Sequence, residues 1–171
     1  MSQNKTLSIR EICLFGILAA LTFAAKYVMS WLPNIEPVSL MVMLFAVTFG
    51  WKALFPIYVY VLMEILFYGL GTWNFNYFYI WSILAFTALA LRGMKGSLSW
   101  AVLSGCFGLL FGAVCAPVDV FIGGFSYAIS KWVSGIPFDL MHCAGNFTIA
   151  LLLFSPMRKL IEQLYQKTLH N

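Results

Sequence analysis

Long apolar segments, each separated from the next by a short polar or glycine-containing stretch, run through almost the whole sequence. The hydrocarbon core of a bilayer is about 30 Å thick, and a helix needs about 20 mostly apolar residues to cross it. Only 9% of the 171 residues are charged, whereas ordinary soluble domains carry about 25% charged residues. Such a chain cannot cover a folded domain with polar surface, so the sequence predicts an all-α integral membrane protein.

The positions of the polar breaks predict six transmembrane helices. Their expected ranges are 10–31, 37–50, 53–70, 76–92, 97–117 and 135–166. The range 37–50 is short for a full span and is expected to tilt or to lean on its neighbours. The stretch "PVDVFIGGFSYAISKWVSG", residues 117–135, is predicted as a long loop.

The whole chain, residues 1–171, is expected to form a single transmembrane domain. The first apolar segment is longer than the apolar part of a typical secretory signal, so we expect a retained helix. The last predicted helix outruns the bilayer, and residues 156–171 are therefore expected to form a cytoplasmic or interfacial helical end.

The basic residues predict the orientation in the membrane. Of the ten lysines and arginines, only Lys26 and Lys131 lie outside the N-terminus, the second and fourth predicted loops and the C-terminus. Basic residues concentrate on the cytoplasmic side of membrane proteins. The sequence therefore predicts that both termini are cytoplasmic, and the net charge of +4 gives no reason to expect a nucleic-acid partner.

Several polar residues are predicted to lie in the outer half of the membrane, where a charge costs about 2.5 to 3.5 kcal/mol. Glu64 is the most informative of these residues, because its short side chain has little reach to the interface. Two interpretations of Glu64 stay open: it lines a cavity, or it has a structural role, either in a pair with Lys26 or as a hydrogen-bonded neutral acid.

A polar stripe opens the last predicted helix. Asp139, His142, Cys143 and Asn146 follow one another at helical spacing and therefore share one face. This pattern favours a pocket for a polar small molecule, and the alternative is a polar contact between helices.

The outer loops add further candidates for binding. Aromatic residues at this level usually anchor a protein at the membrane interface, and this interpretation stays open beside a stacking role in a site. The candidate substrate-binding residues from these loops and their borders are Glu36, Trp73, Asn74, Asn76, Tyr77, Trp81, Asp119 and Lys131.

Two stripes of small residues occur at intervals of four. One comprises Gly16, Ala20 and Ala24 in the first predicted helix, and the other comprises Ser104, Gly108, Gly112 and Ala116 in the fifth. Such stripes allow close approach of helix backbones. For the fifth helix we expect packing within the chain, whereas spacing alone leaves open whether the first stripe packs internally or against a partner.

In these features the chain resembles the substrate-binding S components of energy-coupling factor (ECF) transporters. The resemblance is carried by a lone unit of six predicted helices, by Ala20-x-x-x-Ala24 within "AALTFAA", by the proline-bounded outer loop "LPNIEPVSL", and by the polar outer half of the last helix. It covers essentially the whole chain.

The resemblance implies a multi-pass protein of a bacterial or archaeal plasma membrane that binds substrate in an outward cavity built by helices 4 to 6 and the outer loops. Ala20 and Ala24, with Gly16, would dock onto a membrane T component coupled to two cytoplasmic ATPases. Asn34 and Glu36 would belong to a lid. The chain itself would be no enzyme and would carry no cofactor, which agrees with its lack of a GxxxxGK[ST] motif.

The expected substrate is a small organic micronutrient, a vitamin or a related heterocycle such as a queuosine precursor. No metal site is expected, because the family's nickel and cobalt members carry an N-terminal histidine motif that "MSQNKTLSIRE" lacks. The alternative is an autonomous proton-coupled carrier with Glu64 or Asp139 as the proton site. A third hypothesis is a membrane enzyme that depends on His142.

Overall fold

The computed structural model describes residues 6–32 and 35–170, and all regular structure within them is helical. The elements are α1 (Ile9–Val28), α2 (Val38–Phe49), the 3-10 helix η1 (Gly50–Ala53), α3 (Leu54–Tyr68), α4 (Thr72–Ala90), α5 (Ser97–Leu109) and α6 (Phe111–His170). The predicted all-α class is confirmed. Asn34, which the resemblance assigns to a lid, lies outside the described residues.

In the described parts of the chain, three helical stretches are long and apolar enough to cross a membrane by length and composition: Ile9–Val28, Val38–Tyr68 and Ser97–Leu169. Many large apolar side chains on these stretches are exposed, among them Leu66, Phe121 and Leu152. Soluble proteins rarely expose so much apolar surface. The helices therefore suit a membrane environment, while the six spans and the cytoplasmic termini stay predictions.

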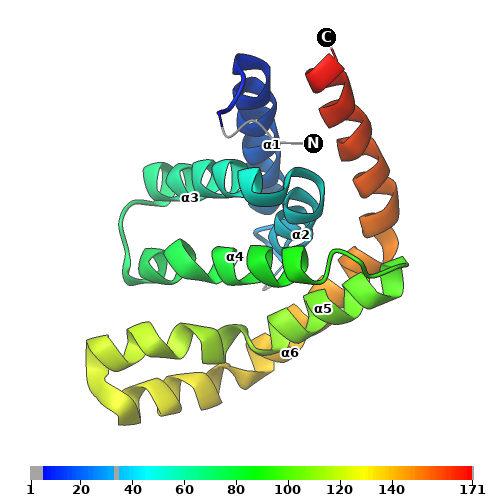
Figure 1. Ribbon diagram of the computed structural model, residues 1–171. Coiled ribbons are helices and arrows are strands. Elements are labelled where there is room, and N and C mark those ends of the chain that lie inside the picture. The colour runs from blue at the N-terminus through cyan, green and yellow to red at the C-terminus, as the bar shows by residue number, and fades with distance from the viewer. Residues whose placement is uncertain (1–5, 33–34, 171) are drawn as a thin grey trace.

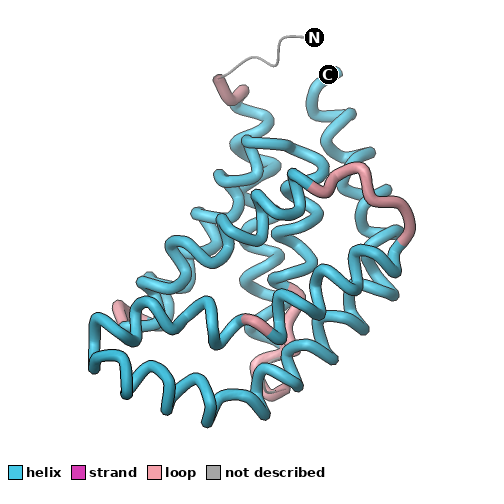
Figure 2. Tube along the Cα trace, turned by 60° about the horizontal axis from the view of Figure 1, so that its bottom comes forward, coloured by secondary structure: helices cyan, strands magenta, loops and turns pink. Residues whose placement is uncertain are grey.

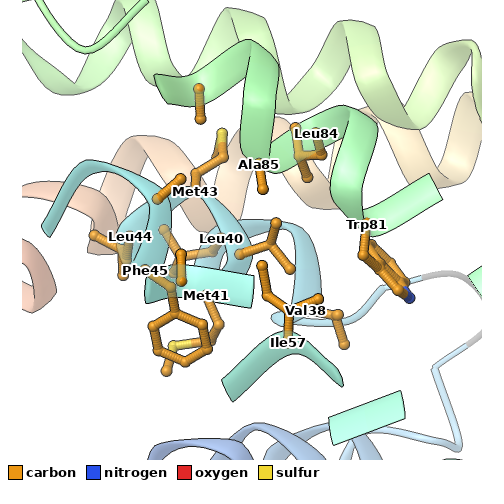
Figure 3. Packing of buried hydrophobic residues seen from close by; sticks show 14 of the residues in the cluster. Val38, Leu40, Met41, Met43, Leu44, Phe45, Ile57, Trp81, Leu84 and Ala85 are labelled. Carbon is orange, nitrogen blue, oxygen red and sulfur yellow. The ribbon is translucent and has the colours of Figure 1, made fainter. Parts of the chain in front are cut away.

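Helix α2 forms the centre of the fold. Its 12 residues extend over only about 18 Å, and all residues from Val38 to Ala46 are buried. Figure 3 shows Val38 and Leu40 of α2 beside Trp81 and Leu84 of α4. The range predicted to tilt or to lean on its neighbours is thus a short helix enclosed by them.

The predicted loop at 117–135 is wrong, because helix continues through it with one interruption. Gly124 adopts φ 82° and ψ 176°, a conformation that only glycine enters readily. Residues on both sides remain helical, so 111–123 and 125–142 form the first and second arms of what we call the α6 hairpin (Figure 1). The predicted helix at 97–117 is also interrupted, at Leu110, where α5 ends.

The hairpin continues into a long antiparallel pairing of α5 with α6. Near the tip, Lys131 Nζ donates to Asp119 Oδ1 at 2.5 Å, and at the far end the hydroxyls of Ser97 and Ser155 are 2.6 Å apart. Small residues make this pairing close. A Cβ on Gly108 would lie 2.8 Å from the backbone carbon and oxygen of His142.

This close approach predicts opposite effects for one substitution at two glycines. Gly108→Ala should destabilise the protein by about 1 to 3 kcal/mol, because backbone atoms of α5 and α6 must move apart. Gly16→Ala on α1 meets nothing within 4 Å and should be neutral or slightly stabilising, since alanine favours helix over glycine. Unfolding of both variants in the same lipid measures the difference, and equal stabilities would contradict the assigned packing.

The start of α1 and the end of α6 lie together, at the opposite end of the molecule from the hairpin tip (Figures 1 and 2). Glu11 joins three segments there. Its carboxylate accepts from Lys52 Nζ at 2.7 Å and from the Tyr165 hydroxyl at 2.9 Å, and it completes a capping box with Ser8. A wide recess of about 1310 Å³ beside these residues carries both acidic and basic side chains.

Candidate functional site

A cavity of about 480 Å³ lies between the start of α4 and the α6 hairpin. We call it the α4/α6 cavity. Six of the predicted substrate-binding residues line it: Trp73, Asn76, Asp119, Lys131, Asp139 and His142. Its volume falls within the range of about 300 to 1,000 Å³ that is typical of small-molecule sites.

The α4/α6 cavity is formed because three chain segments converge. Helix α4 begins at Thr72, earlier than predicted, and this places Trp73 and Asn76 on its first turns. The first hairpin arm contributes Asp119, and the second contributes Lys131, Asp139 and His142. The predicted third helix contributes no lining residue, so the cavity wall opposite α6 is α4.

Asp139 is the most exceptional group in the cavity wall. Its side chain is buried, Oδ1 accepts a hydrogen bond from the backbone N–H of Gly112 at 3.2 Å, and Oδ2 has no hydrogen-bond partner among the described residues. A Cβ on Gly112 would come within 2.5 Å of Oδ2. The glycine therefore gives the carboxylate room, and a buried polar atom without a partner is costly unless a ligand or water satisfies it.

His142 lies one helical turn beyond Asp139 on the same face, as its spacing predicts. Its ring packs edge-on against Phe111 with centroids 4.8 Å apart, and its Nε2 has no hydrogen-bond partner among the described residues. The cavity thus presents two neighbouring polar atoms, one on a carboxylate and one on an imidazole, for a bound molecule.

The other charges of the cavity are paired. Asp119 is buried and bonds Lys131, whose side chain is half exposed. Because the two residues come from opposite arms, their bond braces the hairpin across Gly124. Trp73, Phe111, Trp132 and Phe138 supply aromatic surface around these polar groups.

Glu64 lies outside the α4/α6 cavity, in a second polar cluster that we call the Lys26 cluster. Lys26 Nζ is 2.7 Å from Glu64 Oε2, 3.8 Å from Glu36 Oε2 and 3.1 Å from the Tyr77 hydroxyl. Of the two interpretations of Glu64, this geometry supports the structural pair with Lys26. Burial raises the pKa of the Glu36 carboxyl, Lys26 opposes the increase and Glu64 adds to it.

Aromatic rings connect the Lys26 cluster to the cavity. Tyr77 belongs to the cluster, and its ring packs edge-on against Trp73, which lines the cavity, with centroids 5.1 Å apart. Tyr77 therefore packs behind a lining residue, and Glu36 belongs to the Lys26 cluster; neither of these predicted residues lines the cavity itself.

Three further predicted residues have structural partners. Asn74 Oδ1 accepts from the backbone N–H of Gly71 at the start of α4. Asn146 Nδ2 donates to Ser39 Oγ at 3.0 Å and to the Ser104 carbonyl at 3.3 Å, which ties α6 to α2 and α5. Trp81 is fully buried and packs against Tyr77.

Sequence reasoning missed several lining residues as site candidates. Phe111, Gly112 and Cys115 lie in the range assigned to packing of the fifth predicted helix, and Phe138 directly precedes the polar stripe of the last predicted helix. Gly112 was noticed as part of a small-residue stripe. The same spacing that allows helix packing also leaves room for a carboxylate, and the sequence does not distinguish the two.

The two small-residue stripes face different surroundings. Ser104 and Gly108 are buried against α6, as expected for internal packing. On α1, Ala20 and Ala24 are exposed, and Gly16 has open space around its Cα. Among the described residues, no helix covers Ala20 and Ala24 of the α1 stripe.

Comparisons with models of protein families, with curated proteins and with solved structures find no match for this chain.

Proposed function

We propose that the chain is a substrate-binding S component of an ECF transporter in a bacterial or archaeal plasma membrane. It captures a small organic micronutrient, a vitamin or a related heterocycle such as a queuosine precursor, in the α4/α6 cavity. A membrane T component and two cytoplasmic ATPases then drive uptake. Both chain ends face the cytoplasm in this proposal, and the hairpin tip lies on the outer side.

One observation carries the proposal: the α4/α6 cavity combines aromatic walls with the unpartnered polar atoms of Asp139 and His142. A site of this kind binds an organic molecule through ring contacts and orients it through a few hydrogen bonds. Its location at the end opposite the chain termini agrees with capture from the outside.

The exposed α1 stripe gives independent support. Gly16, Ala20 and Ala24 would admit a partner helix to close backbone distance. Because no helix in the described part of the chain covers Ala20 and Ala24, the stripe is available for the docking role that the resemblance implies. A chain that docks onto an energising module needs no nucleotide-binding motif of its own.

The test combines identification of the ligand with measurement of its transport. The protein is purified in lipid nanodiscs, and native mass spectrometry identifies the small molecule bound to it. That compound, in labelled form, is then offered to liposomes containing the chain alone or the chain with a T component and its ATPases. We expect uptake only with the complete module and ATP.

Uptake by the chain alone, driven by a proton gradient and abolished by an uncoupler, would replace the proposal with the proton-coupled carrier. Chemical conversion of the compound, lost on substitution of His142, would instead indicate a membrane enzyme.

A further inference from the structure

We propose that the α4/α6 cavity selects a cationic ligand, an aromatic ring bearing a protonated nitrogen such as an amidinium or ammonium group, and that Asp139 is its counter-ion. The inference rests on the proposed function, since it names the chemical class of the molecule captured. It goes further by specifying the sign of the ligand's charge.

The charges of the cavity wall give the first argument. The residues that line the cavity include two carboxylates and one lysine. Lys131 is committed to Asp119 at 2.5 Å, and among the described residues Asp139 has no cationic partner within 4.0 Å. A buried carboxylate without compensation is strongly unfavourable, and a bound cation removes this cost more completely than a neutral donor does.

The geometry around Asp139 gives the second argument. Oδ1 is held by the Gly112 backbone N–H, which fixes the carboxylate in place and leaves Oδ2 for the ligand. Gly112 lacks the side chain that would fill the space beside Oδ2. A planar amidinium carries two NH2 groups, so one could donate to Oδ2 while the other remains available to a second acceptor of the cavity wall such as His142 Nε2.

The aromatic walls give the third argument. Trp73 on α4 faces the same cavity as Phe111 and Trp132 of the α6 hairpin. Aromatic faces attract cations, and the attraction strengthens where water is excluded. The same rings accept the flat body of an aromatic ligand, so the cavity suits both parts of the proposed molecule.

Three probes that share one ring but differ in charge test the inference: benzamidine, benzamide and benzoate. Their binding to the full chain is measured by titration calorimetry in phosphatidylcholine nanodiscs, with empty nanodiscs as the blank. We expect benzamidine to bind at least about tenfold more tightly than benzamide, as a charge-assisted contact requires, and benzoate to show no saturable binding.

Asp139→Asn keeps the shape of the side chain and an acceptor for the Gly112 N–H. It should lower benzamidine affinity at least about tenfold and remove the preference over benzamide. Because the substitution removes a buried charge without a partner, the unfolding midpoint in the absence of probe should not fall. Glu162→Gln makes the same chemical change near the chain terminus, where the partner is Arg158, and should keep the preference.

Benzamide or benzoate binding as tightly as benzamidine would overturn the inference. So would an unchanged preference in Asp139→Asn, or no saturable binding of any probe. These outcomes are separate from failure of the proposed function. Selective binding of the cation without uptake by the complete module would contradict the transporter assignment alone. Uptake of a neutral or anionic compound by the complete module would contradict only the proposed charge of the ligand.

Discussion

Ala20→Trp is expected to reduce uptake to background while leaving ligand binding by the purified chain nearly unchanged. Ala20 lies on the exposed α1 stripe, between Gly16 and Ala24, and remote from the residues that line the α4/α6 cavity. An indole at this position would hold a partner helix away from the α1 backbone. A loss of at least tenfold in docking, about 1.4 kcal/mol or more, would follow from the lost close packing.

The matched control is Val102→Trp, which adds the same ring to an exposed apolar position on α5. This variant should retain uptake. Labelled-substrate uptake and calorimetric binding are measured on the same preparations of both variants. If Ala20→Trp lost binding and uptake together, or if both variants transported normally, the α1 stripe would lose its docking role.

Lys26→Met should cost about 3 to 5 kcal/mol of folding free energy, the range typical of a buried ion pair that loses one partner. Only 2% of the Glu64 side chain is exposed, and its Oε2 lies 2.7 Å from Lys26 Nζ. The methionine fills similar space but leaves the Glu64 carboxylate without its cation. Reversible unfolding of the variant in mixed micelles measures the loss.

The double variant Lys26→Met/Glu64→Gln removes both charges and should recover most of that stability. As a control, Arg158→Met breaks the exposed ion pair of Arg158 with Glu162 in the C-terminal part of α6. It should change stability by less than about 1 kcal/mol. If the double variant were no more stable than Lys26→Met, the Lys26–Glu64 pair would not be the source of the effect.

Local periodicity was the part of the site that the sequence predicted well. Asp139 and His142 share a helix face because three residues of helix turn the chain through almost one revolution, and both line the cavity. The inference needed only that this segment be helical, which its apolar pattern indicates. Trp73 and Asn76 were predicted as residues of an outer loop and its border, and they line the same cavity from the first turns of α4, which begins earlier than predicted.

The α6 hairpin could not be predicted by the same reasoning. A Gly-Gly pair within a stretch that also contains charged and hydroxyl residues usually indicates a loop, yet within α6 only Gly124 leaves helical geometry. The Asp119–Lys131 bond and the contacts between the arms decide the outcome, and these form only when the two arms are already side by side. Tertiary contacts therefore overrode the local preference.

The role of Glu64 depended on a contact across 38 residues. Composition and depth indicated that this acid needs either a partner or a cavity. The sequence was compatible with both, a pair with Lys26 of α1 or a water-filled cavity. Choosing between them requires the relative rotation of α1 and α3, which no spacing within either helix records. Asp139 could be recognised as the carboxylate without a cationic partner in the cavity wall only after Glu64 had been paired with Lys26 and Asp119 with Lys131.

Gly124 has a consequence for access to the cavity. The lining residues of both hairpin arms belong to one stretch of chain, joined at this glycine and clamped by Asp119 and Lys131. Because the two arms are joined at the glycine and bonded to each other, we expect any displacement that widens the cavity mouth to move both arms together relative to α4. Entry of a ligand by such a movement would leave both arms helical.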